Sequence, residues 1–328
     1  MQEGIPMEEK KALVFDIGRF RSTDGVGIRT IIFFKGCPLR CLWCSNPFGL
    51  SPQKQLVVNR DKCSGCGACV EACPHGVNVI SGPGEAVSVA HRECLLCGQC
   101  VKACIAGARM ISGVEYTARE LFHEANKDAM FYRRGGGGVT LSGGEVLLQH
   151  EVAAETLRLC REAGLNTCIE TSGFAPWAHL WLVAQYCHTV FYDVKHMDRE
   201  KSKALTGASN EMILDNLQRL CHVLPSKGGR VIVRMPVVPG YNDTDEEIIR
   251  AARFVATLEN HPEWNLLLYH DLGASKYAMI GQQYALPGHM ENRKKKDARI
   301  QEIYELCKKY APGIRVSIGG DAIQRGCV

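Results

Sequence analysis

"IRTIIFFKGCPLRCLWCSNP", residues 28–47, is a short apolar run followed at once by three cysteines. The run at 28–36 predicts a buried β-strand, because apolar β-branched and aromatic residues bounded by glycine favour that conformation. Five more such runs follow, at 139–142, 166–171, 189–195, 230–236 and 265–270. Helix-like stretches alternate with them, at 149–164, 176–187, 211–224, 245–259 and 294–310. This alternation indicates a parallel sheet with right-handed crossovers, so we predict an α/β fold with six βα units in a closed or partial TIM-type barrel.

Residues 52–112 break the alternation, because they are rich in cysteine and glycine and leave little room for long helices. We therefore expect three parts. Residues 1–51 form the first part of the barrel with the cysteine loop, 52–112 an inserted domain, and 113–328 the remainder of the barrel. In barrel enzymes the chemistry lies where strands end and loops begin, and the cysteine loop follows the first predicted strand directly.

The charge and hydropathy of the chain argue against several classes of function. The formal net charge is +4, from 39 basic and 35 acidic residues, which does not favour nucleic acid or an anionic membrane as a partner. The dense basic run at 293–296 is expected on the solvated face of a helix. The chain opens with no basic segment followed by a long apolar stretch, and no window of about 18 apolar residues occurs. We therefore expect neither a signal peptide nor a membrane span, and we predict a cytoplasmic protein.

Seventeen cysteines occur in the chain, and eleven of them fall between residues 37 and 104. Thiols of an unexported chain stay reduced, so this cluster indicates metal binding rather than disulfides. The remaining six are expected to be ordinary core or surface residues, with Cys327 as a candidate exposed thiol.

The insertion contains the segments "CSGCGACVEACP" and "CLLCGQCVKAC", which both have the C-x2-C-x2-C-x3-C spacing of bacterial ferredoxins. In this pattern three cysteines hold one cubane and the fourth reaches the other cluster. We assign Cys63, Cys66, Cys69 and Cys104 to one [4Fe–4S] cluster, and Cys94, Cys97, Cys100 and Cys73 to a second. Zinc is the alternative, but zinc sites normally pair two C-x2-C knuckles across a longer gap. The two clusters would either relay electrons or staple the insertion together, and we favour a relay.

The opening loop has the spacing C-x3-C-x2-C, with Cys37, Cys41 and Cys44 and no fourth cysteine. Three thiolates can hold three irons of a cubane and leave the fourth iron without a protein ligand. A zinc site short of one ligand would look similar, but such sites usually recruit a nearby His or Asp, and no His lies in the loop. The open iron can chelate an amino group and a carboxylate, both of which the methionine end of S-adenosylmethionine supplies.

With these motifs the sequence resembles the radical S-adenosylmethionine enzymes and, more narrowly, the activating enzymes of glycyl-radical enzymes. The opening signature is "STDGVGIRTIIFFKGCPLRCLWCSNP" (22–47). The later motifs follow in the expected order: "VTLSGGE" (139–145), "ETSG" (170–173), "DVKHMD" (193–198), "VRMPVVPGYND" (233–243) and "YHDLGASKY" (269–277). The resemblance covers most of the chain and implies a partial (β/α)6 barrel of the radical S-adenosylmethionine type. Many of these activases also carry a ferredoxin-like insertion.

The resemblance implies reductive cleavage of S-adenosylmethionine to methionine and a 5′-deoxyadenosyl radical, which takes hydrogen from a glycine of a partner glycyl-radical enzyme. Catalysis would depend on Cys37, Cys41, Cys44 and Lys195. The expected cofactors are S-adenosylmethionine and three [4Fe–4S] clusters, one in the opening loop and two in the insertion. We expect flavodoxin or ferredoxin as the electron donor and a monomer when the protein is free. Two alternatives stay open: a radical S-adenosylmethionine enzyme acting on a small molecule, and a plain iron–sulfur electron carrier.

Several strand-end residues are candidate cofactor contacts. Gly143 and Gly144 let backbone approach a ligand closely, and by resemblance their segment binds the amino group of the methionine moiety. Lys195 shares a strand face with residue 193 and either forms a structural ion pair or neutralises the cofactor carboxylate. Glu170 and Thr171 position the cofactor, hold a monovalent cation beside its carboxylate, or cap a helix. The full set of expected contacts is Trp43, Ser45, Gly143, Gly144, Glu145, Glu170, Thr171, Asp193, Val194, Lys195, Arg234 and His270.

Overall fold

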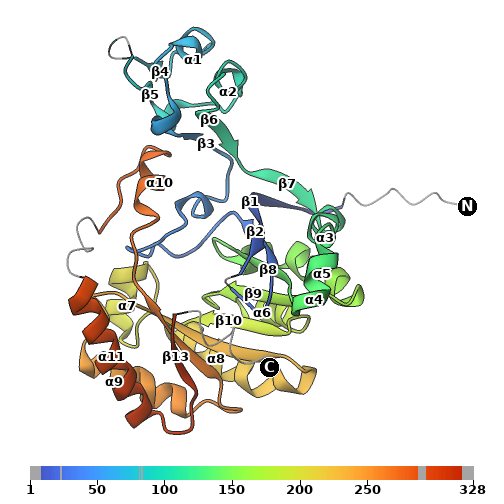
Figure 1. Cartoon of the computed structure of the whole chain (residues 1–328), viewed down its shortest axis with the longest axis vertical. Coiled ribbons are helices and arrows are strands. Elements are labelled where there is room, and N and C mark those ends of the chain that lie inside the picture. Colours follow the sequence, from blue (N-terminus) through green and yellow to red (C-terminus); the bar gives the residue numbers. More distant parts are fainter. Residues whose placement is uncertain (1–8, 23, 81, 83, 287–292, 320–328) are drawn as a thin grey trace, which may run out of the picture.

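The structure, a computed structural model, describes residues 9–22, 24–80, 82, 84–286 and 293–319. Within those residues the main sheet has nine strands in the order β13-β12-β11-β10-β9-β8-β2-β1-β7 (Figure 1). The strands are β1 Lys11–Arg21, β2 Arg29–Phe34, β7 Val114–Thr117, β8 Gly138–Gly143, β9 Asn166–Thr171, β10 Thr189–Asp193, β11 Arg230–Val237, β12 Glu263–Leu268 and β13 Val316–Ile318. The neighbours from β2 through β13 pair in parallel, whereas β1 pairs antiparallel with both β2 and β7. Since β13 and β7 are opposite edges of this sheet, the barrel is partial.

Helices pack along this sheet. They are α3 Ala118–Asn126, α4 Ala129–Gly135, α5 His150–Glu162, α6 Trp177–Ala184, α7 Arg199–Thr206, α8 Glu211–Val223, α9 Asp245–Ala256 and α11 Arg293–Tyr310. Among them, α3, α5, α8 and α9 each present one apolar stripe. Local signals set where they begin: Thr117 and Glu120 form a capping box at α3, and Thr244 caps α9. Leu157 of α5, Leu217 of α8 and Ile248 of α9 are fully buried in the same apolar core as the strands.

The insertion lies at one end of the molecule, above the barrel in Figure 1. It contains two small antiparallel pairs, β3 Gln55–Val58 with β6 Arg109–Ser112 and β4 Asn78–Val79 with β5 Ser88–Val89. Its helices are short: α1 Ala68–Glu71, α2 Gln99–Lys102, and the 3-10 turns η2 Arg60–Lys62 and η3 His91–Glu93. The helix α10, Ala274–Ala278, lies between the insertion and the barrel (Figure 1). The backbone N–H of Val58 donates to the carbonyl of Met279, just after α10, at 2.8 Å.

The structure confirms the six predicted βα strands and their parallel arrangement, and the helices in the described part of 52–112 have only three or four residues. The run at 28–36 is not the first strand, because β1 precedes it and extends the sheet antiparallel. The sequence analysis also missed β7 and β13, which have four and three residues, and the helices α3, α4, α7 and α10.

Three further expectations concern the basic run at 293–296, the chain termini and membrane-spanning helices. The basic run at 293–296 begins α11, although its side chains are outside the described structure. Cys327 and the first eight residues are also outside the described residues. Across the described ranges, no helix combines the length and the apolar character that a membrane crossing requires.

Candidate active site

The three-cysteine loop follows β2 and is closed on itself by backbone hydrogen bonds. The N–H of Cys37 donates to the carbonyl of Leu50 at 3.2 Å, and the N–H of Cys44 donates to the carbonyl of Cys41 at 3.1 Å. The α10 residue Tyr277 donates its hydroxyl to the carbonyl of Cys44 at 3.0 Å. Burial raises the pKa of the Cys37 thiol to about 12 and that of the Cys41 thiol to about 11. Thiols in such surroundings ionise when a bound cation compensates their charge, which suits metal ligands.

A cavity of about 260 Å³ opens beside this loop at the carboxyl ends of the barrel strands. It is lined by all three loop cysteines and by eleven of the twelve expected cofactor contacts: Trp43, Ser45, Gly143, Gly144, Glu145, Glu170, Thr171, Asp193, Lys195, Arg234 and His270. These residues are far apart in the sequence and come together because parallel strands deliver their ends to one edge of the sheet. Val194 is the exception, because its side chain is 3% exposed and packs in the hydrophobic core.

Glu145 joins the loops that follow β8 and β9 by hydrogen bonds. Its carboxylate, in a side chain that is 1% exposed, accepts hydrogen bonds from the hydroxyls of Thr171 and Ser172, both at 2.6 Å. It also accepts from the backbone N–H of Ser172 at 2.9 Å. Burial raises the pKa of Glu145, and these hydrogen bonds oppose the rise. Glu145 therefore orients the β8 and β9 loops.

Four charged residues, Glu170, Asp193, Lys195 and Arg234, form a charged wall of the cavity. Lys195 Nζ donates to Asp193 Oδ2 at 2.9 Å, and Arg234 Nη1 donates to Glu170 Oε1 at 2.5 Å. Burial and then the Asp24 carboxylate raise the pKa of Glu170, against the charge of Arg234. Burial lowers the pKa of Lys195, but the charge of Asp193, the hydrogen bond to it and the charges of Cys41 and Cys37 together raise the pKa above its ordinary value, so Lys195 stays protonated.

Two buried atoms of this wall lack a hydrogen-bond partner, Asp193 Oδ1 and Arg234 Nε. The two atoms face each other as an ion pair at 3.8 Å, which is beyond hydrogen-bond distance. Buried polar atoms are nearly always hydrogen-bonded, so this donor and this acceptor fit a polar ligand bound in the cavity. The residues that line the cavity suit a zwitterionic ligand, because they include cationic, anionic and backbone groups.

The structure also corrects one interpretation and adds residues. Glu170 and Thr171 do not cap the following helix, because α6 begins after Pro176 without a side-chain cap. Ser142, which donates to Glu170, and Ser172, which donates to Glu145, both line the cavity. Both serines stand inside the motifs "VTLSGGE" and "ETSG", so a signal for them was present. Further lining residues that the sequence analysis missed are Leu39, Asn46, Pro236, Leu267, Leu268 and Tyr269.

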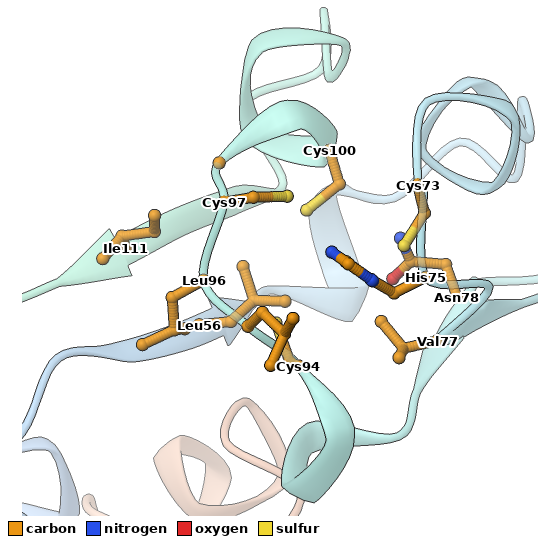
Figure 2. Close-up of a pocket in the computed structure, with 12 residues that line it drawn as sticks. Leu56, Cys73, His75, Val77, Asn78, Cys94, Leu96, Cys97, Cys100 and Ile111 are labelled. Carbon is orange, nitrogen blue, oxygen red and sulfur yellow. The ribbon is translucent and has the colours of Figure 1, made fainter.

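The insertion contains two smaller cavities that are each surrounded by four cysteines. One is lined by Cys63, Cys66, Cys69 and Cys104, the other by Cys73, Cys94, Cys97 and Cys100. Figure 2 shows the second cavity, where Cys73 reaches across from the other cysteine motif and His75 points into the same space. Each cavity thus contains three cysteines of one motif and the fourth of the other. Among the described residues no group of three or more His, Cys, Asp or Glu side chains is placed to hold a single metal ion.

Comparisons with known proteins agree with this geometry. The family model of the radical SAM superfamily matches residues 89–252, and that of the 4Fe-4S dicluster domain matches residues 55–105. The choline trimethylamine-lyase activating enzyme of Oleidesulfovibrio alaskensis is 39% identical over 312 residues, which cover 93% of this chain and 97% of that relative. The 4-hydroxyphenylacetate decarboxylase activating enzyme of Clostridium scatologenes is 36% identical over 301 residues, which cover 90% and 95% of the two chains.

A crystal structure of Streptococcus suis SuiB bound to precursor peptide SuiA is similar in fold, with a TM-score of 0.51 at 10% identity. The similar region covers 87% of this chain and 46% of that one, and this likeness concerns the fold alone. The chain has a cavity with three cysteines at the strand ends and an insertion with two groups of four cysteines. Relatives that match nearly its full length are glycyl-radical enzyme activating enzymes by name, which agrees with both features. The chain belongs to the family of glycyl-radical enzyme activating enzymes within the radical SAM superfamily.

Proposed function

We propose that this chain activates a partner glycyl-radical enzyme by binding S-adenosylmethionine against a [4Fe–4S] cluster held by Cys37, Cys41 and Cys44. One observation carries the proposal: a single cavity joins three cysteines that lack a fourth with a wall of partly buried charged groups. When bound, the cluster supplies the electron for reductive cleavage of the sulfonium, from which hydrogen abstraction at a glycine of the partner follows.

The residues of this chain bind and orient the cofactor. Lys195, which stays protonated, is proposed to neutralise the carboxylate of the methionine moiety. The segment with Gly143 and Gly144 is proposed to receive its amino group, because glycine leaves room for backbone to approach a ligand. Glu170 and Asp193 offer carboxylate oxygens, which suit a monovalent cation beside the cofactor carboxylate. Asp193 Oδ1 and Arg234 Nε form an ion pair at 3.8 Å but no hydrogen bond, so both are proposed to hydrogen-bond polar groups of the ligand.

The cavity also needs to exclude water from a reactive site. Trp43 is 7% exposed and packs with Val238, Tyr277 and Tyr284 on one side of the cysteine loop. Leu267 and Leu268 line the cavity near His270. These apolar side chains are proposed to shield the reacting atoms, which is the protein's share of the chemistry besides binding.

The insertion is proposed to hold two further [4Fe–4S] clusters, which would make three in the chain. Support comes from the two four-cysteine cavities, whose membership follows the crossed pattern of bacterial ferredoxins. We propose that these clusters relay electrons from a flavodoxin or ferredoxin. We further propose a cytoplasmic monomer with the division at residues 52–112 described above.

The partner is proposed only as a class. Relatives between 36% and 40% identical are named as activating enzymes of lyases, dehydratases and decarboxylases. Because these sequence identities are so similar, they do not indicate which kind of partner enzyme this chain activates.

The experiment mixes anaerobically reconstituted protein with S-adenosylmethionine, dithionite and a candidate glycyl-radical enzyme. The expected result is 5′-deoxyadenosine in the chromatogram and a glycyl-radical doublet in the paramagnetic resonance spectrum of the partner. Cleavage of S-adenosylmethionine without a doublet on any candidate, but with turnover of a small molecule, would contradict the proposal. An absence of S-adenosylmethionine binding would reduce the protein to an electron carrier.

A further inference from the structure

The insertion is an internal repeat, in which residues 63–79 correspond position by position to residues 94–110. Both halves carry the same cysteine spacing, and both short helices follow a glycine with left-handed φ, Gly67 at 76° and Gly98 at 77°. Each half supplies three cysteines to its own cavity and one to the other. Two clusters in such a frame would have nearly equal surroundings unless side chains at matching positions differ.

Among the matching positions that differ, two place residues of different charge or polarity in the linings of the two cavities. Asn78 in the first half corresponds to Arg109 in the second, and His75 corresponds to Ala106. His75 lines the cavity of Cys73, Cys94, Cys97 and Cys100 (Figure 2). Arg109 and Ala106 line the other cavity, with Cys63, Cys66, Cys69 and Cys104.

Arg109 is an unusual residue, because it is a buried cation without an anionic partner. It is 4% exposed, and among the described residues it forms no ion pair. Its Nη1 donates to Asn78 Oδ1 at 2.8 Å, while its buried Nη2 has no hydrogen-bond partner. A buried, unpaired guanidinium is costly, so a negative group is needed beside it.

Arg109 lines the same cavity as Cys63, Cys66, Cys69 and Cys104, so its guanidinium lies beside the proposed cluster site. An iron–sulfur cluster with four thiolates carries net negative charge and sulfur acceptors, and therefore matches a guanidinium that lacks both a counter-ion and an acceptor.

We propose that Arg109 makes the insertion electrochemically asymmetric by stabilising the reduced form of the cluster held by Cys63, Cys66, Cys69 and Cys104. On uptake of one electron from dithionite the cluster goes from [4Fe–4S]2+ to [4Fe–4S]+, and with its four thiolates from charge −2 to −3. A nearby fixed positive charge favours the more negative state, so it raises the reduction potential of that cluster. The neighbouring cavity is lined by the neutral Asn78 at the matching position and not by Arg109, so its cluster is stabilised less by this charge. Arg109 is a positioning and tuning residue, and the electron would rest on its cluster in preference to the neighbour.

The inference rests on the proposed function, because it requires both insertion clusters. The test is a redox titration of the reconstituted full chain, followed by paramagnetic resonance, with iron counted in parallel. Arg109→Gln should shift one midpoint potential to a more negative value and leave the others in place. Arg109→Lys, which keeps the charge, should shift it less. Lys102→Gln removes an exposed positive charge of the same domain and is the matched control, expected to leave all potentials unchanged.

The shifted signal is assigned with a second change, Cys97→Ala, at an exposed cysteine of the other cavity. The Arg109→Gln shift should persist in that background. The inference is overturned if no potential moves beyond that of the Lys102→Gln control, if every potential moves equally, or if Arg109→Lys shifts as far as Arg109→Gln. If Arg109→Gln loses iron, Arg109→Lys should retain it, and loss from both overturns the inference. A wild-type protein without two insertion clusters would instead contradict the proposed function.

Discussion

Gly144 is the residue at which one added methyl group should test the geometry of the site most directly. A Cβ atom built there would lie 2.2 Å from the carbonyl oxygen of Gly36 and 2.3 Å from that of Gly49. These carbonyls flank the three-cysteine loop, which begins after Gly36 and ends near Gly49. Gly144→Ala therefore pushes directly against the loop that is proposed to hold the cluster.

The size of the effect follows from these contacts. A carbon and a carbonyl oxygen ordinarily approach to about 3.3 Å, so both backbone segments need to move by about 1 Å. Neither contact is with a flexible side chain, so the strain stays in the backbone. Overpacking of this kind costs about 1–3 kcal/mol of stability. A displacement of about 1 Å at a reacting centre lowers rates by about 100-fold.

The assay measures 5′-deoxyadenosine formation by anaerobically reconstituted protein, iron content and the free energy of unfolding in urea. Gly144→Ala should lower the rate by about 100-fold and lower stability by about 1–3 kcal/mol. Gly135→Ala is the matched control, because its nearest neighbour would be 4.0 Å away and it lies at the end of helix α4. Alanine is favoured over glycine in helices, so this control should be neutral or slightly stabilising. Wild-type rate and stability in Gly144→Ala would refute the reasoning.

Three further predictions concern metal content and pH. Cys41→Ala should abolish S-adenosylmethionine cleavage while the insertion keeps about eight irons, and full cleavage would contradict the assignment of the loop. Fully loaded wild-type protein should contain about 12 iron atoms per chain, and a preparation dominated by zinc would count against all three clusters. Burial lowers the pKa of Lys35 to about 8, whereas the unfolded chain has a pKa of about 10.4 at this residue. Below pH 8 the proton on Lys35 therefore lowers the free energy of unfolding. This loss of stability disappears as pH rises from about 8 to the unfolded pKa. The free energy of unfolding in urea should therefore rise between about pH 8 and 10 in wild type relative to Lys35→Met, and a constant difference would be inconsistent with this burial effect.

Much of the fold was predictable because the sequence carries strong local signals. The apolar runs of β2 and β8 through β12 and the amphipathic helices that follow them have periods that can be read without tertiary information. The strand β1 was missed although it is the longest strand of the sheet, with 11 residues. Its sequence, "KALVFDIGRFR", places charged residues within the run, and its antiparallel pairing to β2 and β7 is a long-range choice.

The site was predictable to the extent that motifs mark it. Cysteine spacing alone led to the crossed membership of the two insertion cavities, and the cavities have that membership. The motif residues at the strand ends line one cavity, with Val194 as the exception, because alternation along the chain after β10 turns its side chain into the core. Glu145, predicted as a ligand contact, lines the cavity, and the structure adds that its carboxylate accepts hydrogen bonds from Thr171 and Ser172.

The amino-acid sequence by itself determined the number and spacing of the sulfur ligands, the order of the six parallel strands and the family. It could not show that Arg109 is buried without a counter-ion, or that Gly144 lies against Gly36 and Gly49. Ligand spacing and hydropathic period depend only on residues that are neighbours along the chain, so they can be determined from the sequence. Burial, close approach and unpaired charge depend on which distant segments meet, and only the packed structure brings those segments together.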